Sequence, residues 1–177
     1  MTDLATTLVL GGARSGKSAF AESLVSTSTL AKVYVATATA GDEEMKSRIA
    51  LHRARRGEGW TTIEEPLALV DALTREAGRT RVVLVDCLTL WLSNLMFAGR
   101  DPDVEGRRLT QFLDVAKHPV VFVSNEVGLG LVPEAPLGRA FRDAQGRLNQ
   151  LVAAAVPQVV FMAAGLPLWL KRSSQGE

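Results

Sequence analysis

Cysteine is nearly absent from this sequence, which has only Cys87 among its 177 residues. An internal disulfide is therefore impossible, and a metal site built from several cysteines is excluded. This scarcity fits a reducing compartment, and we expect a cytoplasmic location. Histidine is almost as rare, because the chain has only two histidines, His52 and His118.

Neither sign of charge prevails in the composition. Twenty Lys and Arg residues face 19 Asp and Glu residues, which leaves a formal net charge of +1 at pH 7. The chain as a whole therefore has no electrostatic attraction to nucleic acid, and we expect no nucleic-acid partner. A hydrophobic content of 47% is sufficient for a core, and the length predicts a single domain over residues 1–177.

A long uninterrupted hydrophobic run is also missing. Residues 151–170 approach the length of a membrane span and contain only one polar side chain, Gln158. Two prolines and a glycine interrupt this run, so we expect a helix end, a strand at Gln158–Met162 and a last strand at Leu168–Lys171. No basic region precedes the first hydrophobic segment, so we expect neither a signal peptide nor stable membrane insertion.

One glycine-rich motif is present in full. Residues 11–18 read GGARSGKS and fit the pattern G-x-x-x-x-G-K-[ST], between a predicted strand, Thr7–Leu10, and a helix-like stretch, Ala19–Val25. In this setting, backbone amides and the helix N-terminus hold phosphates. Lys17 is expected to face solvent and bind the β- and γ-phosphates, while the Ser18 hydroxyl holds Mg²⁺. The motif predicts a protein that binds a nucleoside triphosphate.

Strands and helices are predicted to alternate along the chain. The predicted strands are Thr7–Leu10, Val33–Ala36, Trp60–Ile63, Arg81–Asp86, Val120–Ser124, Gln158–Met162 and Leu168–Lys171. The predicted helices are Ser18–Ser26, Glu43–Arg55, Pro66–Ala77, Leu88–Ala98, Asp103–Ala116 and Leu137–Val156. Short, continuously apolar strands indicate burial on both faces, which is typical of a mostly parallel sheet flanked by helices. The last connection is too short for a parallel crossover, so the final strand is predicted to be antiparallel.

Further polar residues follow two of the predicted strands. Asp86 ends a buried strand and is a candidate to orient Mg²⁺ beside Ser18. The alternative is that Asp86 caps the helix that follows it. Asn125 and Glu126 follow the next strand and are candidates to contact a γ-phosphate or an acceptor hydroxyl. For these two residues, a loop that caps itself by hydrogen bonds is an equal alternative.

His52 lies in a predicted basic helix, whereas His118 is interpreted as a structural or surface residue. Helical spacing places Arg48, His52, and either Arg55 or Arg56 on one face. By pattern alone, this arrangement favours a solvated basic helix with a surface histidine. The functional alternative is that arginines hold a triphosphate while the neutral imidazole attacks its α-phosphate. Such an attack forms a phosphoramidate and releases pyrophosphate.

Longer stretches of the sequence match one enzyme family. They are GGARSGKS from Gly11, YVATA from Tyr34, RIALHR from Arg48, VDCLTLWLSN from Val85, SNEVGLGLVP from Ser124 and RAFRD from Arg139. The Asn-Glu-Val-Gly-x-Gly-x-Val-Pro stretch and the Phe-Arg-Asp-x-x-Gly-x-x-Asn-Gln run are the most specific. From Leu8 to Lys171, the sequence resembles the bifunctional adenosylcobinamide kinases/adenosylcobinamide-phosphate guanylyltransferases of cobalamin biosynthesis.

This resemblance implies a RecA-like P-loop NTPase fold and two reactions. One reaction phosphorylates the aminopropanol hydroxyl of adenosylcobinamide with ATP or GTP. The other transfers GMP from GTP to the resulting phosphate through a guanylyl-histidine intermediate, and yields adenosyl-GDP-cobinamide. Because the family histidine falls on His52, the resemblance favours the functional interpretation of that residue.

The resemblance adds to the site residues that the motifs predict. The catalytic role of His52 comes from the resemblance, whereas the catalytic role of Lys17 and the magnesium roles of Ser18 and Asp86 come from the glycine-rich motif and from the position of Asp86 at a strand end. Nucleotide contacts fall on Gly11, Gly12, Ala13, Arg14, Ser15, Gly16, Lys17, Ser18, Ala36, Thr37, Ala38, Arg53, Ala54, Arg55, Arg56, Glu64 and Asp86. Some relatives have a second histidine where this chain has Leu51, and some have Glu in place of Asp86.

The family implies a corrinoid substrate and a homotrimer with nucleotide at the subunit boundaries. The helix face formed by Arg139, Asp143 and Arg147 is a candidate for such a boundary, and a solvated face is the alternative. Two rival functions stay open on the residues alone: a P-loop kinase that needs no histidine, and a nucleotide-driven switch or motor. Against the second rival, the sequence lacks the Asn-Lys-x-Asp motif of regulatory GTPases.

Overall fold

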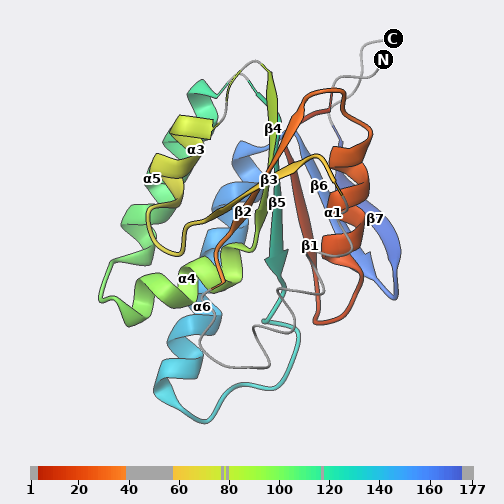
Figure 1. The fold of residues 1–177 in the computed structure, drawn as a ribbon. Coiled ribbons are helices and arrows are strands. Elements are labelled where there is room, and N and C mark those ends of the chain that lie inside the picture. The colour runs from red at the N-terminus through yellow and green to blue at the C-terminus, as the bar shows by residue number, and fades with distance from the viewer. Residues whose placement is uncertain (1–3, 39–57, 77, 79, 117, 173–177) are drawn as a thin grey trace.

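The computed structural model describes residues 4–38, 58–76, 78, 80–116 and 118–172. Within them, one sheet has the strand order β3-β2-β4-β5-β1-β6-β7. The strands are β1 (Thr7–Gly11), β2 (Ala31–Ala36), β3 (Trp60–Glu64), β4 (Arg81–Asp86), β5 (Val120–Asn125), β6 (Gln158–Ala163) and β7 (Leu166–Lys171). The described helices are α1 (Lys17–Ser26), α3 (Leu69–Glu76), α4 (Leu88–Phe97), α5 (Pro102–Val115) and α6 (Pro136–Ala155). Helix α1 covers one face of the sheet, and α3, α4, α5 and α6 lie on the other (Figure 1).

The sheet is parallel except at its last pair of strands. Strands β6 and β7 are antiparallel, and Ala164 and Gly165 join them. Both linking residues have positive φ, 52° and 81°, as a two-residue hairpin turn requires. Because this turn is tight, β7 begins at Leu166 rather than at Leu168. The prediction of a mostly parallel α/β sheet with a final antiparallel strand is confirmed.

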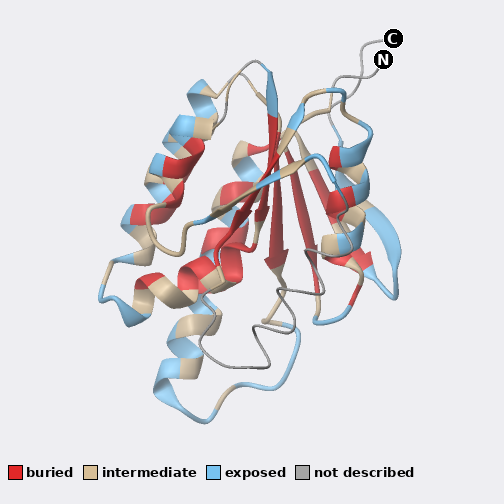
Figure 2. Ribbon diagram, viewed as in Figure 1, coloured by how far each residue is buried: buried red, intermediate tan, exposed pale blue. Residues whose placement is uncertain are grey.

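The central strands are buried on both faces. Val83 and Val85 face the core beneath α3, α4, α5 and α6, whereas Val82 and Leu84 face the core beneath α1. Figure 2 shows this burial as a continuous buried band along the middle of the sheet. The fully buried indole of Trp91 contributes the largest side chain to the first core. Two-sided burial explains why the predicted strands read as uninterrupted apolar runs.

The apolar run over residues 151–170 divides as predicted among three elements. It supplies the end of α6, the whole of β6 and most of β7. Among the described residues, no helix is both long enough and apolar enough to cross a membrane.

Helix α3 begins later than predicted, at Leu69 rather than Pro66. The Glu65 carboxylate accepts hydrogen bonds from the amides of Leu67, at 3.2 Å, and Ala68, at 2.8 Å. These bonds satisfy amides that precede the first helical turn, so the chain reaches α3 through a side-chain-capped turn. The predicted helix Glu43–Arg55 lies outside the described residues.

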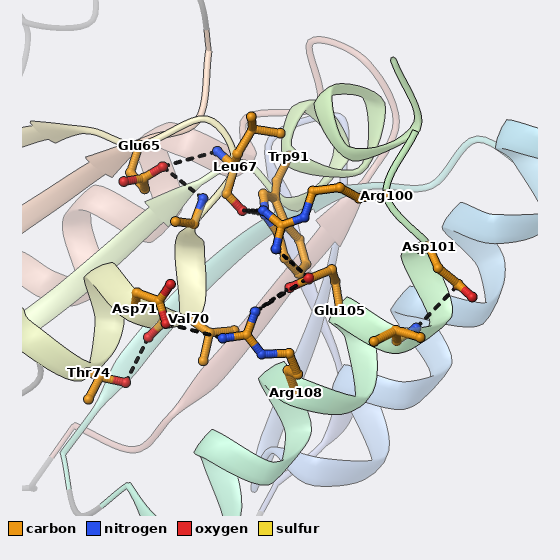
Figure 3. Close-up of polar contacts among 12 residues, drawn as sticks. Glu65, Leu67, Val70, Asp71, Thr74, Trp91, Arg100, Asp101, Glu105 and Arg108 are labelled. Atoms are coloured by element: carbon orange, nitrogen blue, oxygen red, sulfur yellow. Dashed lines mark hydrogen bonds and ion pairs between the residues drawn. The ribbon is translucent and has the colours of Figure 1, made fainter. Parts of the chain in front are cut away.

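A buried carboxylate joins the helices on one side of the sheet (Figure 3). Glu105, on α5, pairs with Arg100 and with Arg108, whose Nη1 lies 3.1 Å from Oε2. Arg108 also reaches Asp71 on α3, at 3.2 Å. Arg100 donates to the carbonyl of Leu67, at 3.4 Å. The network therefore connects α3, α5 and the loop between α4 and α5.

We expect Glu105→Ala to lower the free energy of unfolding by roughly 2 kcal/mol, because it leaves two partly buried guanidinium groups without their shared carboxylate. Urea denaturation measures this change. Glu76→Ala removes the more exposed pair with Arg81 and serves as the control, with an expected loss below about 1 kcal/mol. Equal losses in both variants would contradict a structural role for the Glu105 network.

Candidate functional site

The glycine-rich loop connects β1 to α1 and has the form of an anion site. A Cβ atom at Gly11 would lie 2.5 Å from the carbonyl oxygen of Met162, so the chain passes this point only with glycine. Gly16 has φ of 95°, in the left-handed region, and gives α1 no side-chain cap. The amides at this helix end are therefore not satisfied by a capping side chain, and the helix dipole favours an anion there. The turn after β6 supports the loop, because the Gly165 amide donates to the Ser15 carbonyl at 3.0 Å.

Lys17 is buried, with 7% of its surface exposed, so the prediction that it faces solvent is wrong. Its Nζ donates to the Gly12 carbonyl and lies 3.5 Å from Ser15 Oγ. The reason is that the loop wraps around the ammonium group and supplies its own acceptors. Burial lowers the pKa of Lys17 below its usual value of 10.5, and the electrostatic effects of Cys87 and Asp86 oppose that shift. Lys17 thus lies within electrostatic range of the end of β4.

Asp86 ends β4 without capping the helix that follows. The N-cap of α4 is Cys87, whose Sγ accepts a hydrogen bond from the Leu90 amide at 3.5 Å. The alternative prediction, that Asp86 caps α4, is therefore wrong. Burial raises the pKa of the Cys87 thiol to about 12, which leaves it a neutral group at physiological pH. A hydroxyl at Ser18 and a carboxylate at Asp86 are oxygen donors of the kind that Mg²⁺ prefers together with phosphate oxygens.

Other predicted nucleotide contacts meet at the same edge of the sheet. Ala36, the last residue of β2, pairs with Asp86 on one side and with Glu64, the last residue of β3, on the other. Thr37 follows and is fully buried. In the loop itself, Ala13 and Arg14 are exposed, and Gly12 and Ser18 are half-buried. His52 and Arg53–Arg56 lie outside the described residues, so their predicted roles stay predictions.

The end of β5 lies directly beside the start of the loop. Asn125 pairs with Gly11, and the Glu126 amide donates to the Gly11 carbonyl at 3.0 Å. The Glu126 carboxylate accepts from the Gly128 amide at 2.5 Å. This is the self-capping bond that the sequence left as an alternative. The backbone N–H of Asn125 donates to Thr89 Oγ1 at 2.8 Å, which fixes this strand end to α4.

A buried polar cluster behind the site was not foreseen from the sequence. Ser124 Oγ donates to Asn149 Oδ1 at 2.7 Å, and Gln145 Nε2 lies 3.0 Å from both of those atoms. Asn149 Nδ2 in turn donates to the Asn125 carbonyl at 3.1 Å. A signal was present, because Gln145 and Asn149 are four residues apart and share one face of α6 with apolar Leu148 and Val152.

Two of the three candidate boundary residues on α6, Arg139 and Arg147, have partners within this chain. Arg147 Nε lies 3.2 Å from Asp103 on α5, and Arg139 donates to the carbonyls of Pro133 and Glu134. His118 lies two residues before β5, at the opposite end of the sheet from the glycine-rich loop. Its backbone carbonyl accepts a hydrogen bond from Thr6 Oγ1 at 3.5 Å, which does not involve the imidazole, so the interpretation of His118 as structural or surface stays a prediction.

The strand order, the loop and the acidic residue at the end of β4 together define a RecA-like P-loop nucleotide-binding protein. Two solved structures share this fold. The flagellar accessory protein FlaH from Methanocaldococcus jannaschii aligns with a TM-score of 0.58 at 13% identity, over 97% of this chain and 80% of that chain. The RadB recombinase aligns with a TM-score of 0.53 at 14% identity, over 90% and 74%. At these identities, the likeness concerns the fold alone.

The family itself is set by closer sequence matches. The protein-family model described as "Cobinamide kinase / cobinamide phosphate guanyltransferase" matches residues 7–170 of the sequence, and the chain belongs to this family. The bifunctional adenosylcobalamin biosynthesis protein CobP of Pseudomonas aeruginosa is 51% identical over 93% of this chain and 96% of its own length. The corresponding Escherichia coli protein, CobU, is 38% identical over 93% and 98%. The predicted family membership is confirmed.

We expect Lys17→Met to reduce kinase turnover by roughly 10²-fold or more, because a charge directed at the transferred phosphates is lost. Stability at pH 7 should not fall, since the variant no longer buries an ammonium group. Turnover within about twofold of wild type would mean that the loop serves another purpose.

The lowered pKa of Lys17 also predicts a pH dependence. The folded protein releases this proton at lower pH than the unfolded chain does, so the unfolded state binds more protons between the lowered value and 10.5. Wild-type stability should therefore rise with pH in this window relative to Lys17→Met. Urea denaturation at several alkaline pH values tests the sign, and parallel curves for the two proteins would contradict it.

Proposed function

We propose that this protein phosphorylates adenosylcobinamide and then transfers GMP to the product. In the first step, the aminopropanol hydroxyl oxygen attacks the γ-phosphorus of ATP or GTP. The bond to the β-phosphate oxygen breaks, the nucleoside diphosphate leaves, and the hydroxyl proton is released. The observation that carries this proposal is a complete glycine-rich loop in a chain of the cobinamide kinase/guanyltransferase family.

The second reaction proceeds in two displacements. A neutral His52 nitrogen attacks the α-phosphorus of GTP, and pyrophosphate leaves. A phosphate oxygen of adenosylcobinamide phosphate then attacks the same phosphorus, which frees His52 and yields adenosyl-GDP-cobinamide. Splitting the transfer in this way lets each step proceed through an in-line displacement of a good leaving group.

The site offers positioning and charge neutralisation rather than new covalent chemistry for the kinase step. The amides of the loop and the Lys17 ammonium group would hold the β- and γ-phosphates. Ser18 and Asp86 would hold Mg²⁺, which neutralises charge on the phosphate oxygens when bound. Arg53, Ala54, Arg55 and Arg56 are assigned to the GTP used for guanylylation.

The histidine assignment predicts a selective loss of activity. His52→Ala should abolish guanylylation and GMP transfer while retaining much of the kinase reaction, because γ-phosphoryl transfer needs no covalent step at His52. Wild-type protein should take up label from α-labelled GTP, lose it in mild acid and pass it to phosphorylated cobinamide. His118→Ala, at the opposite end of the sheet, is the control and should behave as wild type.

The same labels separate the rival functions. A simple P-loop kinase or a nucleotide switch would retain no α-label on the protein, and γ-labelled GTP should leave none on the guanylyltransferase. An acid-labile guanylyl adduct that persists in His52→Ala would refute the assignment to His52.

We also propose a homotrimer in the cytoplasm, with a corrinoid substrate and no nucleic-acid partner. The outer face of β7 supports assembly, because Leu166, Leu168 and Leu170 are 71%, 60% and 59% exposed on one side of an edge strand. Exposed apolar residues in a row are typical of contact surfaces. A net charge of +1 gives no general attraction to nucleic acid.

Assembly predicts a solution mass near three times the 19.0 kDa chain. Light scattering coupled to gel filtration measures this mass. Leu168→Glu places a charge in the centre of the exposed β7 face and should shift the protein toward monomer. Val115→Glu adds the same charge at an exposed position on α5, and as the control it should leave the solution mass unchanged. A monomeric wild-type protein would contradict the proposal.

A further inference from the structure

Thr37 is fully buried immediately after β2, and the chain satisfies its hydrogen-bonding groups internally. Its amide donates to the Asp86 carbonyl at 3.2 Å. Its hydroxyl donates to the Cys87 carbonyl at 2.7 Å and accepts from the Cys87 amide at 2.8 Å. Its own carbonyl accepts from Asn94 Nδ2 at 2.8 Å. A hydroxyl engaged in this way is poorly placed to contact a nucleotide.

Three of these hydrogen bonds hold backbone groups of Asp86 and Cys87, namely the Asp86 carbonyl and the carbonyl and N–H of Cys87. The Asp86 carbonyl and the Cys87 amide belong to the same peptide unit, and Thr37 contacts both. Fixing this unit fixes the backbone orientation at Asp86, and with it the direction in which the Asp86 side chain leaves the strand. Since β2 and β4 are neighbours with Ala36 opposite Asp86, the sheet register brings Thr37 to this position.

Asn94 secures Thr37 from the other side. Its Nδ2 donates to the Thr37 carbonyl and also to the Pro66 carbonyl, at 3.1 Å. Asn94 lies on α4, which begins directly after Cys87. The ends of β2 and β4 and the connection after β3 are thereby held together by the buried hydrogen bonds between Thr37 and Cys87 and by the partly buried hydrogen bonds of Asn94. Breaking buried hydrogen bonds is costly.

We propose that Thr37 is a positioning residue for Asp86: it holds the end of β4 so that the Asp86 carboxylate is presented to the metal at the glycine-rich loop, and Asn94 holds Thr37 in place. This inference rests on the proposed role of Asp86 toward Mg²⁺. It changes the expected part of Thr37 from a side-chain nucleotide contact to a support for the metal ligand.

Two substitutions at Thr37 and one elsewhere isolate the hydroxyl. Thr37→Val keeps the shape and removes the hydroxyl, whereas Thr37→Ser keeps the hydroxyl. Thr7→Val is the matched control, because Thr7 is also fully buried and its hydroxyl has two partners, the Ala5 carbonyl at 2.8 Å and Gln158 Oε1 at 3.1 Å. Thr7 lies at the opposite end of the sheet from the site.

The experiment titrates Mn²⁺ into full-length protein saturated with the β,γ-imido analogue of GTP, and follows free Mn²⁺ by electron paramagnetic resonance. Thr37→Val should bind Mn²⁺ about tenfold more weakly than wild type, because a ligand displaced by a fraction of an ångström loses much of its contribution. Thr37→Ser and Thr7→Val should stay within about twofold. Affinity for the analogue in EDTA should be unchanged in all three variants.

Several results would overturn the inference. Wild-type Mn²⁺ affinity in Thr37→Val excludes positioning by the hydroxyl, and weaker analogue binding in EDTA indicates a direct nucleotide contact. If Thr37→Val does not fold, Asn94→Ala must weaken Mn²⁺ binding in its place, and unchanged binding overturns the inference.

An Asp86→Asn variant separates the proposed metal role of Asp86 from the proposed positioning of Asp86 by Thr37. Unchanged Mn²⁺ affinity in Asp86→Asn refutes the metal role of Asp86 itself, and with it the basis of the Thr37 inference. Weaker Mn²⁺ binding in Asp86→Asn together with wild-type binding in Thr37→Val refutes only the positioning by Thr37.

Discussion

Burial of the parallel strands β1, β4 and β5 on both faces is the constraint on which the site depends. Because the interior stretches Leu8–Leu10, Val82–Val85 and Val120–Val123 are apolar, they offer no side chains for polar chemistry within the middle of the sheet. The chain places its polar groups where the strands end. Parallel pairing brings those ends to one edge, where Gly11 is opposite Asn125 and Asp86 is opposite Val123 on the same strand as Asn125, although these residues are far apart in sequence.

That edge is held by hydrogen bonds from buried and half-buried side chains as well as by the sheet. Thr37 and Asn94 secure the end of β4, and Ser124, Gln145 and Asn149 secure the end of β5. Buried polar groups are costly unless they are paired, so these networks favour one arrangement of the strand ends over others. Rigid support of this kind suits phosphoryl and nucleotidyl transfer, in which catalysis depends mainly on positioning.

The sequence predicted the elements more reliably than the contacts between them. All seven strands were predicted, and the central strands β1, β4 and β5 gave the clearest signal, because two-sided burial leaves continuous apolar runs. The outer strands β3 and β7 are largely not buried. The start of α3 was misplaced, since the Glu65 carboxylate caps amides that periodicity alone assigns to the helix. The burial of Lys17 was also missed. A lysine within a glycine-rich loop reads as exposed unless the acceptors that the folded loop provides are known.

By itself, the sequence determined the class of chemistry and the family. The glycine-rich motif between a strand and a helix consists of contiguous residues, so it can be recognised without knowledge of the fold. Only the tertiary structure decided the strand order, the burial of Lys17 and the partners of Thr37. The Thr37 hydroxyl bonds to Cys87, 50 residues further along the chain. Such a pairing follows from sheet register and helix packing. The local sequence around either residue does not predict the contact.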